Sequence, residues 1–494
     1  MTLNSVEYNT DLIIRWNQDP SSQNSCIGET IDTLLEKYKH RVQFPTPETA
    51  YLALDNGVAE ALTVDDDGNV SWETLEAVTR HPPKNKDGSS TLVKITTRSG
   101  RTVTATKAKS FLVVESEKVV TKEGSALKVG DKIPVLRTLP KEDRTVVDLN
   151  MYLDPTQYVF TTTMERAYST MMNTPKGQSW FKPFSNSLPY SRSDSCRVAF
   201  DRSVHFRTPG FVYTKKHNKI TKGIPEKITL GSSFGFFVGA YLAEGCCTEH
   251  QIHIANNCQD YRQRAAEWPS SLGIQNHVTN EKHQIKNGGV SISIMFHSTL
   301  LSTLMKTWCN QGSWNKRVPT FAYSAPRAFV IGLLEGYLSG DGTVYKNGSM
   351  NASSRSKALI EGISLLLTRL EIPSTLGNDM VAGSLQHRLY ITIRDAQKLH
   401  AQMTLCVPMK EQRLQHVSQE KKRRKRFKHK STLNDVFIDP IVKIEEVVSE
   451  HPCVYDLTVA ETRNMVTASG LTQRDTFHHA GNSAKNVTLG IPRL

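Results

Sequence analysis

Two stretches with the same pattern decide the fold of the middle of this chain: FGFFVGAYLAEG at residues 234–245 and VIGLLEGYLSGDG at residues 330–342. In each stretch a small residue recurs at every fourth position, which places these residues on one face of a helix. The positions are Gly235, Gly239 and Ala243 in the first stretch and Gly332, Gly336 and Gly340 in the second. Glycine costs about 1 kcal/mol relative to alanine inside a helix. Two such stripes therefore predict two helices that pack backbone against backbone.

An acidic residue follows each stripe, Glu244 before Gly245 and Asp341 before Gly342. A negative charge there opposes the negative end of the helix dipole unless a cation offsets it. Packing the stripes would bring the two carboxylates together, and paired hard oxygen ligands suit Mg²⁺ that bridges a phosphate and its attacking water. The pattern therefore predicts phosphodiester hydrolysis. The alternative is a pair of glycine-rich core helices with polar ends, and the duplication argues against it.

The stretches FVGAYLAEG and LEGYLSGDG resemble the motif of the LAGLIDADG homing endonucleases, over about residues 231–419. The resemblance implies an α+β domain with two αββαββ repeats about a pseudo-twofold axis, whose saddle-shaped sheets lie in the DNA major groove. It makes Glu244 and Asp341 the metal ligands, with Mg²⁺ as cofactor. NKRVP resembles the family's lysine block, so Lys316 would assist the attacking water or the transition-state charge. A surface lysine is the alternative, and we identify no equally clear lysine for the second half.

Contacts to double-stranded DNA are expected from polar positions that follow each motif, because polar side chains on strands reach base edges in the groove. These positions are Gln251, His253, Lys346, Asn351, Ser354, Arg355 and Arg388. The net charge of +13 and the pI near 9.2 also indicate a polyanionic partner. Because both halves of the site lie in one chain, we expect a monomer.

The segments around this domain differ in character. Residues 10–139 show short alternating strand patterns and turn signals, which predict an all-β region, and a second β-rich stretch begins near residue 433. Residues 141–230 are irregular and basic, and we expect a loop-rich insert that is a candidate for DNA contact. The run KKRRKRFKHK lies within residues 420–432 and is read as a phosphate grip, a nuclear address or a solvated linker.

The two ends of the chain belong together. Joining residues 1–4 directly to residues 476–494 gives MTLNTFHHAGNSAKNVTLGIPRL, which resembles the trigger-loop segment of a eukaryotic RNA polymerase II largest subunit. An insert after Asn4 explains both flanks. Ser5 and Thr476 supply the hydroxyl at the start of the insert and the hydroxyl just after it, which self-excision requires. The expected DNA target is the polymerase gene without the insert.

The insert itself resembles an intein. The blocks that carry the resemblance are SVEYNTDLII, GRTVTATKAKSFL, LKVGDKIPV, VYDLTVAETRNMV and TASGLTQRD. They imply an all-β horseshoe (Hint) splicing domain built from residues 5–140 and 433–475, with no cofactor. By resemblance, Ser5 attacks the carbonyl of Asn4 while Thr106 and Lys109 act on the amide. Thr476 then captures the acyl group, and Asp456 helps to activate it.

Four positions depart from the intein pattern. Lys109, Arg463 and Arg474 stand where the family has histidines, and Asp475 replaces the terminal asparagine. Histidine exchanges protons near pH 7, whereas arginine stays charged and lysine must first have its pKa lowered. Asp475 must release the insert through an anhydride or by hydrolysis, so the last step should be slow. Two alternatives stay open: an endonuclease in a slow or inactive splicing domain, and a polymerase subunit with an architectural DNA-binding insert.

Cellular location follows from simpler features. The eight cysteines form no CxxC pair, which favours a reducing compartment. The sequence opens without a charged and apolar leader, and it has no stretch near the roughly 20 apolar residues of a bilayer span. We therefore expect an intracellular, nuclear protein that does not contact a membrane.

Overall fold

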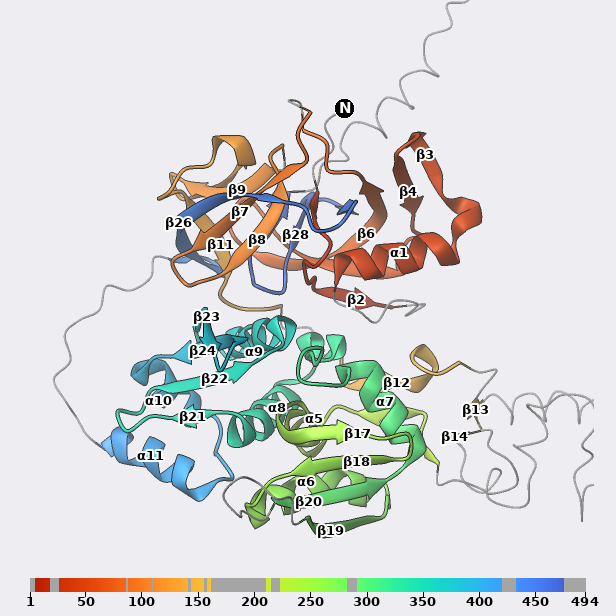
Figure 1. The fold of residues 1–494 in the computed structure, drawn as a ribbon, viewed down its shortest axis with the longest axis vertical. Helices are drawn as coiled ribbons and strands as arrows, with labels where there is room; N and C mark the ends of the chain where they lie inside the picture. Colours follow the sequence, from red (N-terminus) through yellow and green to blue (C-terminus); the bar gives the residue numbers. More distant parts are fainter. Residues whose placement is uncertain are drawn as a thin grey trace, which may run out of the picture.

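The computed structural model describes residues 5–17, 26–85, 88–108, 110–140, 144–154, 158–160, 210–214, 223–281, 291–419 and 432–474. These residues form two lobes (Figure 1). The β-rich lobe combines segments from both ends of the chain, and the mixed lobe is built from the middle. The two flanks, the basic run at residues 421–430 and the positions Lys109, Asp475 and Thr476 lie outside the described residues.

The β-rich lobe is organised around a 12-stranded sheet in the order β11-β26-β7-β8-β1-β27-β6-β4-β3, with β2, β5 and β25 paired at its side. A smaller sheet has the order β10-β9-β29-β28. The strands are β1 (Val6–Glu7), β2 (Ile14–Trp16), β3 (Gln43–Thr46), β4 (Thr49–Ala53), β5 (Ala59–Val64), β6 (Val70–His81), β7 (Thr91–Thr97), β8 (Thr102–Thr106), β9 (Ser110–Glu115), β10 (Lys118–Glu123), β11 (Lys132–Leu136), β25 (Thr432–Leu433), β26 (Val436–Val448), β27 (Val454–Val459), β28 (Asn464–Val466) and β29 (Thr472–Arg474). Because β26 and β27 pair between N-terminal strands, the two ends of the insert form one domain.

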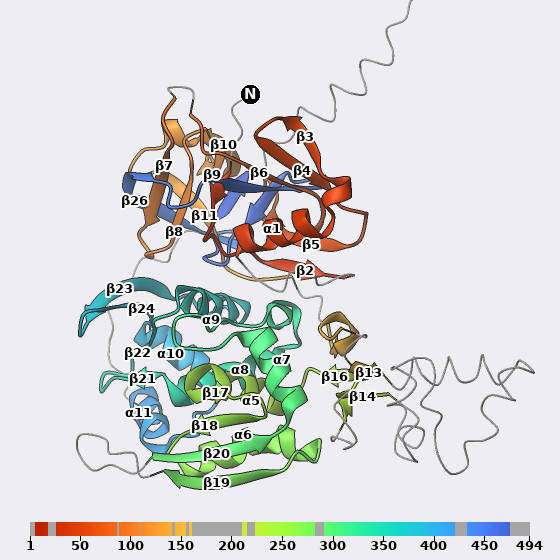
Figure 2. The ribbon, with the colours of Figure 1, turned by 45° about the vertical axis from the view of Figure 1, so that its right-hand side comes forward.

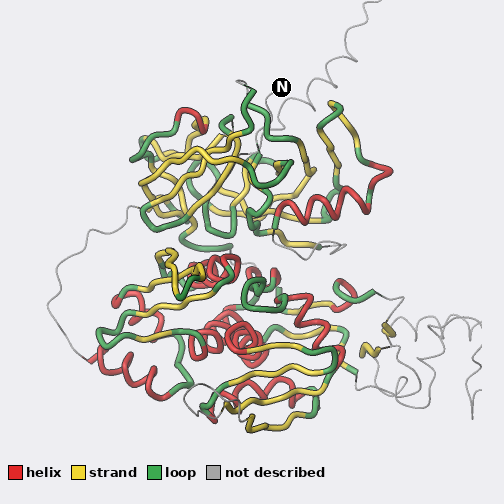
Figure 3. Tube along the Cα trace, viewed as in Figure 1, coloured by secondary structure: helices red, strands yellow, loops and turns green. Residues whose placement is uncertain are grey.

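We had expected residues 10–139 to be entirely β, but this lobe also contains a helix. Helix α1 (Ile27–Lys37) packs against β27 and β6, and it is the longer of the red helical segments in the strand-rich lobe of Figure 3. Its buried residues Ile27, Ile31, Leu34 and Leu35 recur with the spacing of an amphipathic helix. The prediction was wrong here because the strand pattern on both sides was extended across a helical period.

The mixed lobe contains the predicted repeat twice. The first copy runs α5 (Ser232–Glu244), β17 (Gly245–Cys247), β18 (Gln251–Ala255), α6 (Gln259–Ser271), β19 (Asn276–Glu281), β20 (Ser291–His297) and α7 (Thr299–Cys309). The second runs α8 (Arg327–Gly340), β21 (Thr343–Val344), β22 (Met350–Ser354), α9 (Lys357–Arg369), β23 (Thr375–Val381), β24 (Ser384–Ile391) and α10 (Ile393–His400), followed by α11 (Pro408–Gln419). The sheets have equivalent orders, β17-β18-β20-β19 and β21-β22-β24-β23. The predicted fold class is confirmed.

The ends of the segment 141–230 are more ordered than a loop-rich insert. Strand β12 (Val146–Asp148) pairs with β16 (Lys227–Thr229), and β13 (Tyr158–Phe160), β14 (Phe211–Thr214) and β15 (Ile224–Pro225) form a small sheet. Val147 and Ile228 are buried in the core of the mixed lobe. Strands of two to four residues are too short for a period-2 pattern to show. The expected DNA contact falls mainly on residues outside the described ranges.

The turn between β7 and β8 joins the lobes. The N–H of Leu376 donates to the carbonyl of Ser99 at 2.8 Å, and the Arg101 guanidinium donates to the carbonyl of Ser374 at 3.2 Å. Arg101 is 2% exposed, and its burial lowers its pKa to about 10. A Cβ on Gly100 would lie 1.8 Å from the Leu376 carbonyl oxygen. Figure 2 shows β23 and α9 facing the β-rich lobe at this contact. In the described ranges, no helix is both long and apolar enough to cross a bilayer.

Candidate functional site

The first candidate site lies where α5 and α8 end. These helices pack along their glycine stripes, as the sequence predicted. A Cβ on Gly239 would lie 2.0 Å from the carbonyl oxygen of Leu333, and one on Gly336 would lie 2.4 Å from that of Phe236. The two backbones therefore touch, and a larger side chain at these positions has no room.

The close packing brings the two predicted acids together. Glu244 is the last residue of α5, and Asp341 is the C-cap of α8. A Cβ on Gly340, next to Asp341, would lie 3.2 Å from Cγ of Glu244. Burial, and then the charge of Glu244, raise the pKa of Asp341 to about 7. Burial also raises the pKa of Glu244. The site thus holds two carboxylates whose charges are costly without a cation between them.

A lysine accompanies each acid. The buried Lys316 donates from Nζ to the carbonyls of Tyr241 at 2.8 Å and Leu242 at 3.1 Å, at the end of α5. Lys410 donates from Nζ to the carbonyls of Ser339 and Gly340 at 2.6 and 2.7 Å, at the end of α8. Burial lowers the pKa of both amines, and the two acids oppose this shift. Two ammonium groups therefore partly offset the charge of the two carboxylates.

The sequence analysis missed Lys410. No short motif marks it, but both lysines follow the third helix of their repeat: Lys316 comes after α7, and Lys410 comes after α10. Aligning the two repeats in the sequence would have identified Lys410 as the counterpart of Lys316. The sequence showed no equally clear lysine in the second half, and the structure places Lys410 in the corresponding position.

The donor set fits a hard divalent cation in one particular way. Among the described residues, no group of three or more His, Cys, Asp or Glu side chains is placed to hold a metal. The protein supplies two carboxylates, so the remaining ligands have to be water and substrate oxygens. Mg²⁺ is commonly held by one or two carboxylates together with phosphate oxygens. The site is therefore suited to a metal that arrives with, or binds beside, a phosphate.

The raised pKa of Asp341 predicts a stability effect. In the metal-free protein, the protonated form favoured by the fold contributes stability that is fully present below the ordinary value of 3.8 and lost as the pH rises through about 7. Asp341→Asn removes this loss. We expect the variant to be more stable than the unchanged protein at pH 8, by on the order of 2 to 4 kcal/mol, and nearly equal at pH 4. Thermal melts in EDTA test this, and equal melting temperatures at pH 8 would contradict it.

The predicted DNA contacts in the first repeat share one face of their sheet. Gln251 and His253 alternate along β18 with the buried Ile252 and Ile254. Their side chains therefore point away from the core. Gln251 Nε2 lies 3.1 Å from Nδ1 of His297 on β20, and this polar row continues to β19. The structure brings these two predicted residues together.

In the second repeat the predicted DNA-contact residues do not share one face of the sheet. Asn351 and Arg388 lie on the outer face of the sheet, where Arg388 forms a 2.6 Å ion pair with Asp379. Lys346 is exposed in the turn between β21 and β22, and Arg355 lies over the ring of Trp314 at 4.9 Å. Ser354 does not join them. It alternates with the outward positions of β22, and its Oγ accepts the N–H of Ser356. A base contact at Ser354 stays a prediction, although the strand register places its side chain on the face opposite to that of Asn351 and Arg388.

The second candidate site surrounds Ser5 in the β-rich lobe. The fully buried Ser5 donates its N–H to Oγ1 of Thr106 at 3.1 Å, and the N–H of Thr106 donates to the Ser5 carbonyl at 2.9 Å. Thr106 therefore contacts the nitrogen of the bond between Asn4 and Ser5. The predicted placement of Thr106 agrees with this geometry.

Asp456 and His81 lie on the same side of the sheet as Ser5. Val6 pairs with Tyr455 in the antiparallel ladder between β1 and β27. Ser5 comes just before Val6 and Asp456 just after Tyr455, so the side chains of Ser5 and Asp456 are neighbours across the ladder. His81 Nε2 lies 2.7 Å from Oγ of Ser5. Asp456 and His81 are both buried. The sequence analysis did not identify His81, because only the pairing of β6 with β27 places it here.

The remaining predicted residues fall into two groups. Arg463 forms a 2.5 Å ion pair with Glu76. Glu76 is five residues from His81 on β6, or about 16 Å along the strand, so the structure does not bring Arg463 to Ser5. Arg474 ends β29, where the neighbouring Gln473 pairs with Phe111 of β9. The C-terminal strand thus ends beside the turn that follows Thr106. Lys109, Asp475 and Thr476 lie outside the described residues.

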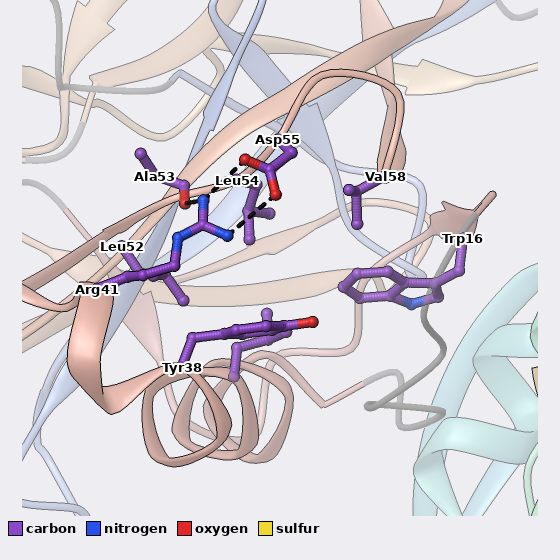
Figure 4. A pocket seen from close by; sticks show the side chains of 9 residues that line it. Trp16, Tyr38, Arg41, Leu52, Ala53, Leu54, Asp55 and Val58 are labelled. Atoms are coloured by element: carbon purple, nitrogen blue, oxygen red, sulfur yellow. Dashed lines mark hydrogen bonds and ion pairs between the residues drawn. The ribbon is translucent and has the colours of Figure 1, made fainter. Parts of the chain in front are cut away.

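A separate hollow in the β-rich lobe is lined by Trp16, Tyr38, Arg41, Asp55 and neighbouring apolar residues (Figure 4). Arg41 forms two hydrogen bonds with Asp55, at 2.9 and 3.0 Å. The hollow has a free volume of about 20 Å³, room for roughly one water molecule. Its charged groups are satisfied by each other, and it lies apart from both sites.

Comparison with known proteins gives one family and several relatives. The family model "Intein splicing domain" matches residues 25–473. A DNA-directed RNA polymerase subunit Rpo1C from Methanocaldococcus jannaschii is 25% identical over 95% of this chain and 55% of its own length. A DNA polymerase from Thermococcus kodakarensis is 23% identical over 74% of this chain and 24% of its own length. The chain thus spans about half of the first relative and a quarter of the second.

Two kinds of solved structure are similar to part of the chain. The transcription factor IIB Mvu mini-intein is 23% identical, with a TM-score of 0.24, over 28% of this chain and 70% of its own. I-DmoI in complex with DNA and Mn is 14% identical, with a TM-score of 0.29, over 35% of this chain and 97% of its own.

Proposed function

The chain belongs to the intein splicing-domain family, and we propose that residues 5–475 excise themselves with Ser5 and Thr476 as nucleophiles. The observation that carries this proposal is the contact network of Ser5. Its amide nitrogen is bound by Thr106 and its hydroxyl oxygen by His81, inside a lobe assembled from both ends of the insert. A buried serine held at both its nitrogen and its oxygen is arranged to change which of the two carries the acyl group.

The proposed reaction begins with an N-to-O acyl shift. Oγ of Ser5 attacks the carbonyl carbon of Asn4, the C–O bond forms, the C–N bond breaks, and the hydroxyl proton ends on the Ser5 nitrogen. Thr106 Oγ1, 3.1 Å from that nitrogen, orients the departing amine. Thr476 Oγ then attacks the resulting ester and returns a proton to Ser5. Asp456, beside Ser5 in the ladder, is proposed to help activate Thr476.

Release of the insert is the step we expect to be slow. The Asp475 carboxylate has to attack its own carbonyl and form a cyclic anhydride, or water has to cut the bond. The freed Thr476 ester then rearranges to a peptide bond. An asparagine amide at this position is the better nucleophile because it closes a succinimide. Slow release would leave a branched ester in which Thr476 carries the acyl group and Ser5 has a free hydroxyl and a free amine.

Expression of the whole chain followed by mass spectrometry tests the splicing proposal. We expect the joined peptide MTLNTFHHAGNSAKNVTLGIPRL, a faster release in Asp475→Asn, and an unspliced precursor in Ser5→Ala. Thr33→Ala removes an exposed hydroxyl on α1 and should behave like the unchanged chain. An intact precursor under all conditions, including in Asp475→Asn, would contradict splicing, and so would cleavage without joining.

A second activity is proposed for the mixed lobe, namely Mg²⁺-dependent cleavage of double-stranded DNA at the polymerase-gene site that lacks the insert. It is favoured by the paired acids with their two lysines and by the polar outer faces of the two sheets. When bound, Mg²⁺ supplies Lewis-acid activation of the scissile phosphate and its attacking water. Glu244 and Asp341 would hold it, and the ammonium groups of Lys316 and Lys410 would stabilise part of the negative charge that develops on the phosphate. A monomer suffices, because one chain supplies both halves.

Plasmid cleavage tests the nuclease without relying on splicing. Ser5→Ala precursor is incubated with Mg²⁺ and a supercoiled plasmid that carries the uninterrupted polymerase site. We expect linear product, and none with EDTA. A matched plasmid, in which the coding sequence of the insert interrupts the site, should stay supercoiled. Equal cutting of both plasmids would contradict the proposed target. The run at residues 421–430 favours a nuclear location, where such a target lies.

A further inference from the structure

We propose that His81 is a catalytic residue of the first splicing step: it takes the proton from Oγ of Ser5 and returns it to the Ser5 nitrogen. This inference rests on the splicing function proposed above. It adds to that proposal a proton carrier on a strand, β6, that the intein resemblance did not mark.

The contacts of His81 fix which ring nitrogen can act as the base. Nδ1 lies 2.8 Å from the carbonyl oxygen of Pro82. A carbonyl only accepts hydrogen bonds, so in the neutral ring Nδ1 carries the hydrogen and Nε2 presents its lone pair. That lone pair lies 2.7 Å from Oγ of Ser5. The serine hydroxyl therefore donates to His81, as a nucleophile does to its base.

Both partners are shielded from water. Ser5 is fully buried, and His81 is 5% exposed. A proton leaving the buried hydroxyl has to go to a protein group, because bulk water is excluded from the contact. Pro82 follows His81 directly and its carbonyl holds Nδ1, so the ring is oriented by its own strand end. The arrangement of nucleophile, base and orienting acceptor is complete within the described residues.

Because this chain lacks histidines that the intein family has, another imidazole is needed to carry the proton. Lys109, Arg463 and Arg474 stand where the family has histidines, and Arg463 is engaged by Glu76. The described part of the β-rich lobe contains three histidines, His40, His81 and His451. His451 stacks on Tyr8 with ring centroids 4.0 Å apart. Of the three, His81 is the one that contacts Ser5.

The proposed step is balanced in atoms and charge. The proton moves from Oγ to Nε2 while Oγ forms its bond to the Asn4 carbonyl carbon, giving an imidazolium and a tetrahedral oxyanion. As the C–N bond breaks, the imidazolium returns the same proton to the Ser5 nitrogen. Thr106 Oγ1 holds that nitrogen during the step. An ester and a neutral amine result, and His81 ends as it began.

The test isolates the first step. In Thr476→Ala the acyl group stops at Ser5, and hydroxylamine then cleaves the ester and releases MTLN as its hydroxamate, which mass spectrometry follows over time. We expect His81→Ala to slow this release by about 10²- to 10⁴-fold. Added imidazole should recover at least about tenfold of it, because it fills the cavity and carries the proton. His451→Ala is the matched control, and it should release the hydroxamate at the same rate as the protein in which His81 is intact.

A fold defect is separated from a chemical one by the rescue and by a second variant. Imidazole cannot restore a misfolded lobe, and His81→Gln, which fills the site without a basic nitrogen, should be slow without rescue while it keeps the melting temperature. Unchanged release in His81→Ala would overturn the inference. So would a loss in His81→Ala that imidazole does not restore although the melting temperature is kept. If Thr476→Ala with His81 intact releases nothing, the splicing proposal itself has failed.

Discussion

Replacing Glu244 by glutamine or Asp341 by asparagine is expected to reduce Mg²⁺-dependent cleavage of the target duplex by about 10³-fold or more. The loss of several kcal/mol of charge stabilisation at the metal corresponds to such a factor. The two acids adjoin at the ends of α5 and α8, and burial, followed by the charge of Glu244, raises the pKa of Asp341 to about 7. A bound cation would offset both effects. Removing either carboxylate leaves one protein ligand. Single-turnover cleavage with excess protein measures the chemical step directly.

Duplex binding by the same variants separates chemistry from recognition. Each change removes a negative charge, so affinity should be kept or should rise. Glu335→Gln is the matched control, because Glu335 lies on α8, is half-buried and accepts the N–H of Thr404, away from the pair. It should cleave normally. Cleavage by Glu244→Gln or Asp341→Asn at the normal rate would disprove the metal assignment, and loss of binding would point to a structural role.

Gly239→Leu is expected to destabilise the mixed lobe by about 3 kcal/mol or more, since overpacking costs typically 1–3 kcal/mol and more where backbone has to move. The obstruction is backbone: a Cβ at Gly239 would lie 2.0 Å from the Leu333 carbonyl oxygen and 2.8 Å from the Tyr337 nitrogen. The helices have to separate. Separation also displaces Glu244 from Asp341, so cleavage should fall along with stability. Urea unfolding, followed by the tryptophan fluorescence of this lobe, measures the change.

Gly231→Ala is the control for this experiment. Gly231 is the N-cap of the same helix, and a Cβ there meets nothing within 4 Å. The expected cost is below about 1 kcal/mol, the typical range for N-cap changes. If Gly239→Leu unfolds at the same urea concentration as Gly231→Ala, the helices do not pack as closely as the structure places them. Splicing in Gly239→Leu should persist, because the Ser5 network lies in the other lobe.

The domain plan and half of each site follow from the sequence alone. Small residues at every fourth position determine which face of a helix packs against its partner. The acid at the end of each stripe is then placed by the packing of that face. The convergence of Glu244 and Asp341 was therefore predictable. Family membership was equally readable from local blocks near the two ends. Gln251 and His253 were predictable as outward residues because they alternate with apolar neighbours.

What only the tertiary structure decided depends on contacts between distant segments. Lys410 reaches the end of α8 from α11, and His81 reaches Ser5 because β27 pairs with both β1 and β6. Strand register also turned Ser354 away from the outer face, and a turn with a positive φ of 53° at Arg463 directs it to Glu76. Local periodicity says which face a side chain occupies. It does not say which segment, hundreds of residues away, supplies the partner, because that depends on which burial and pairing the whole chain can satisfy at once.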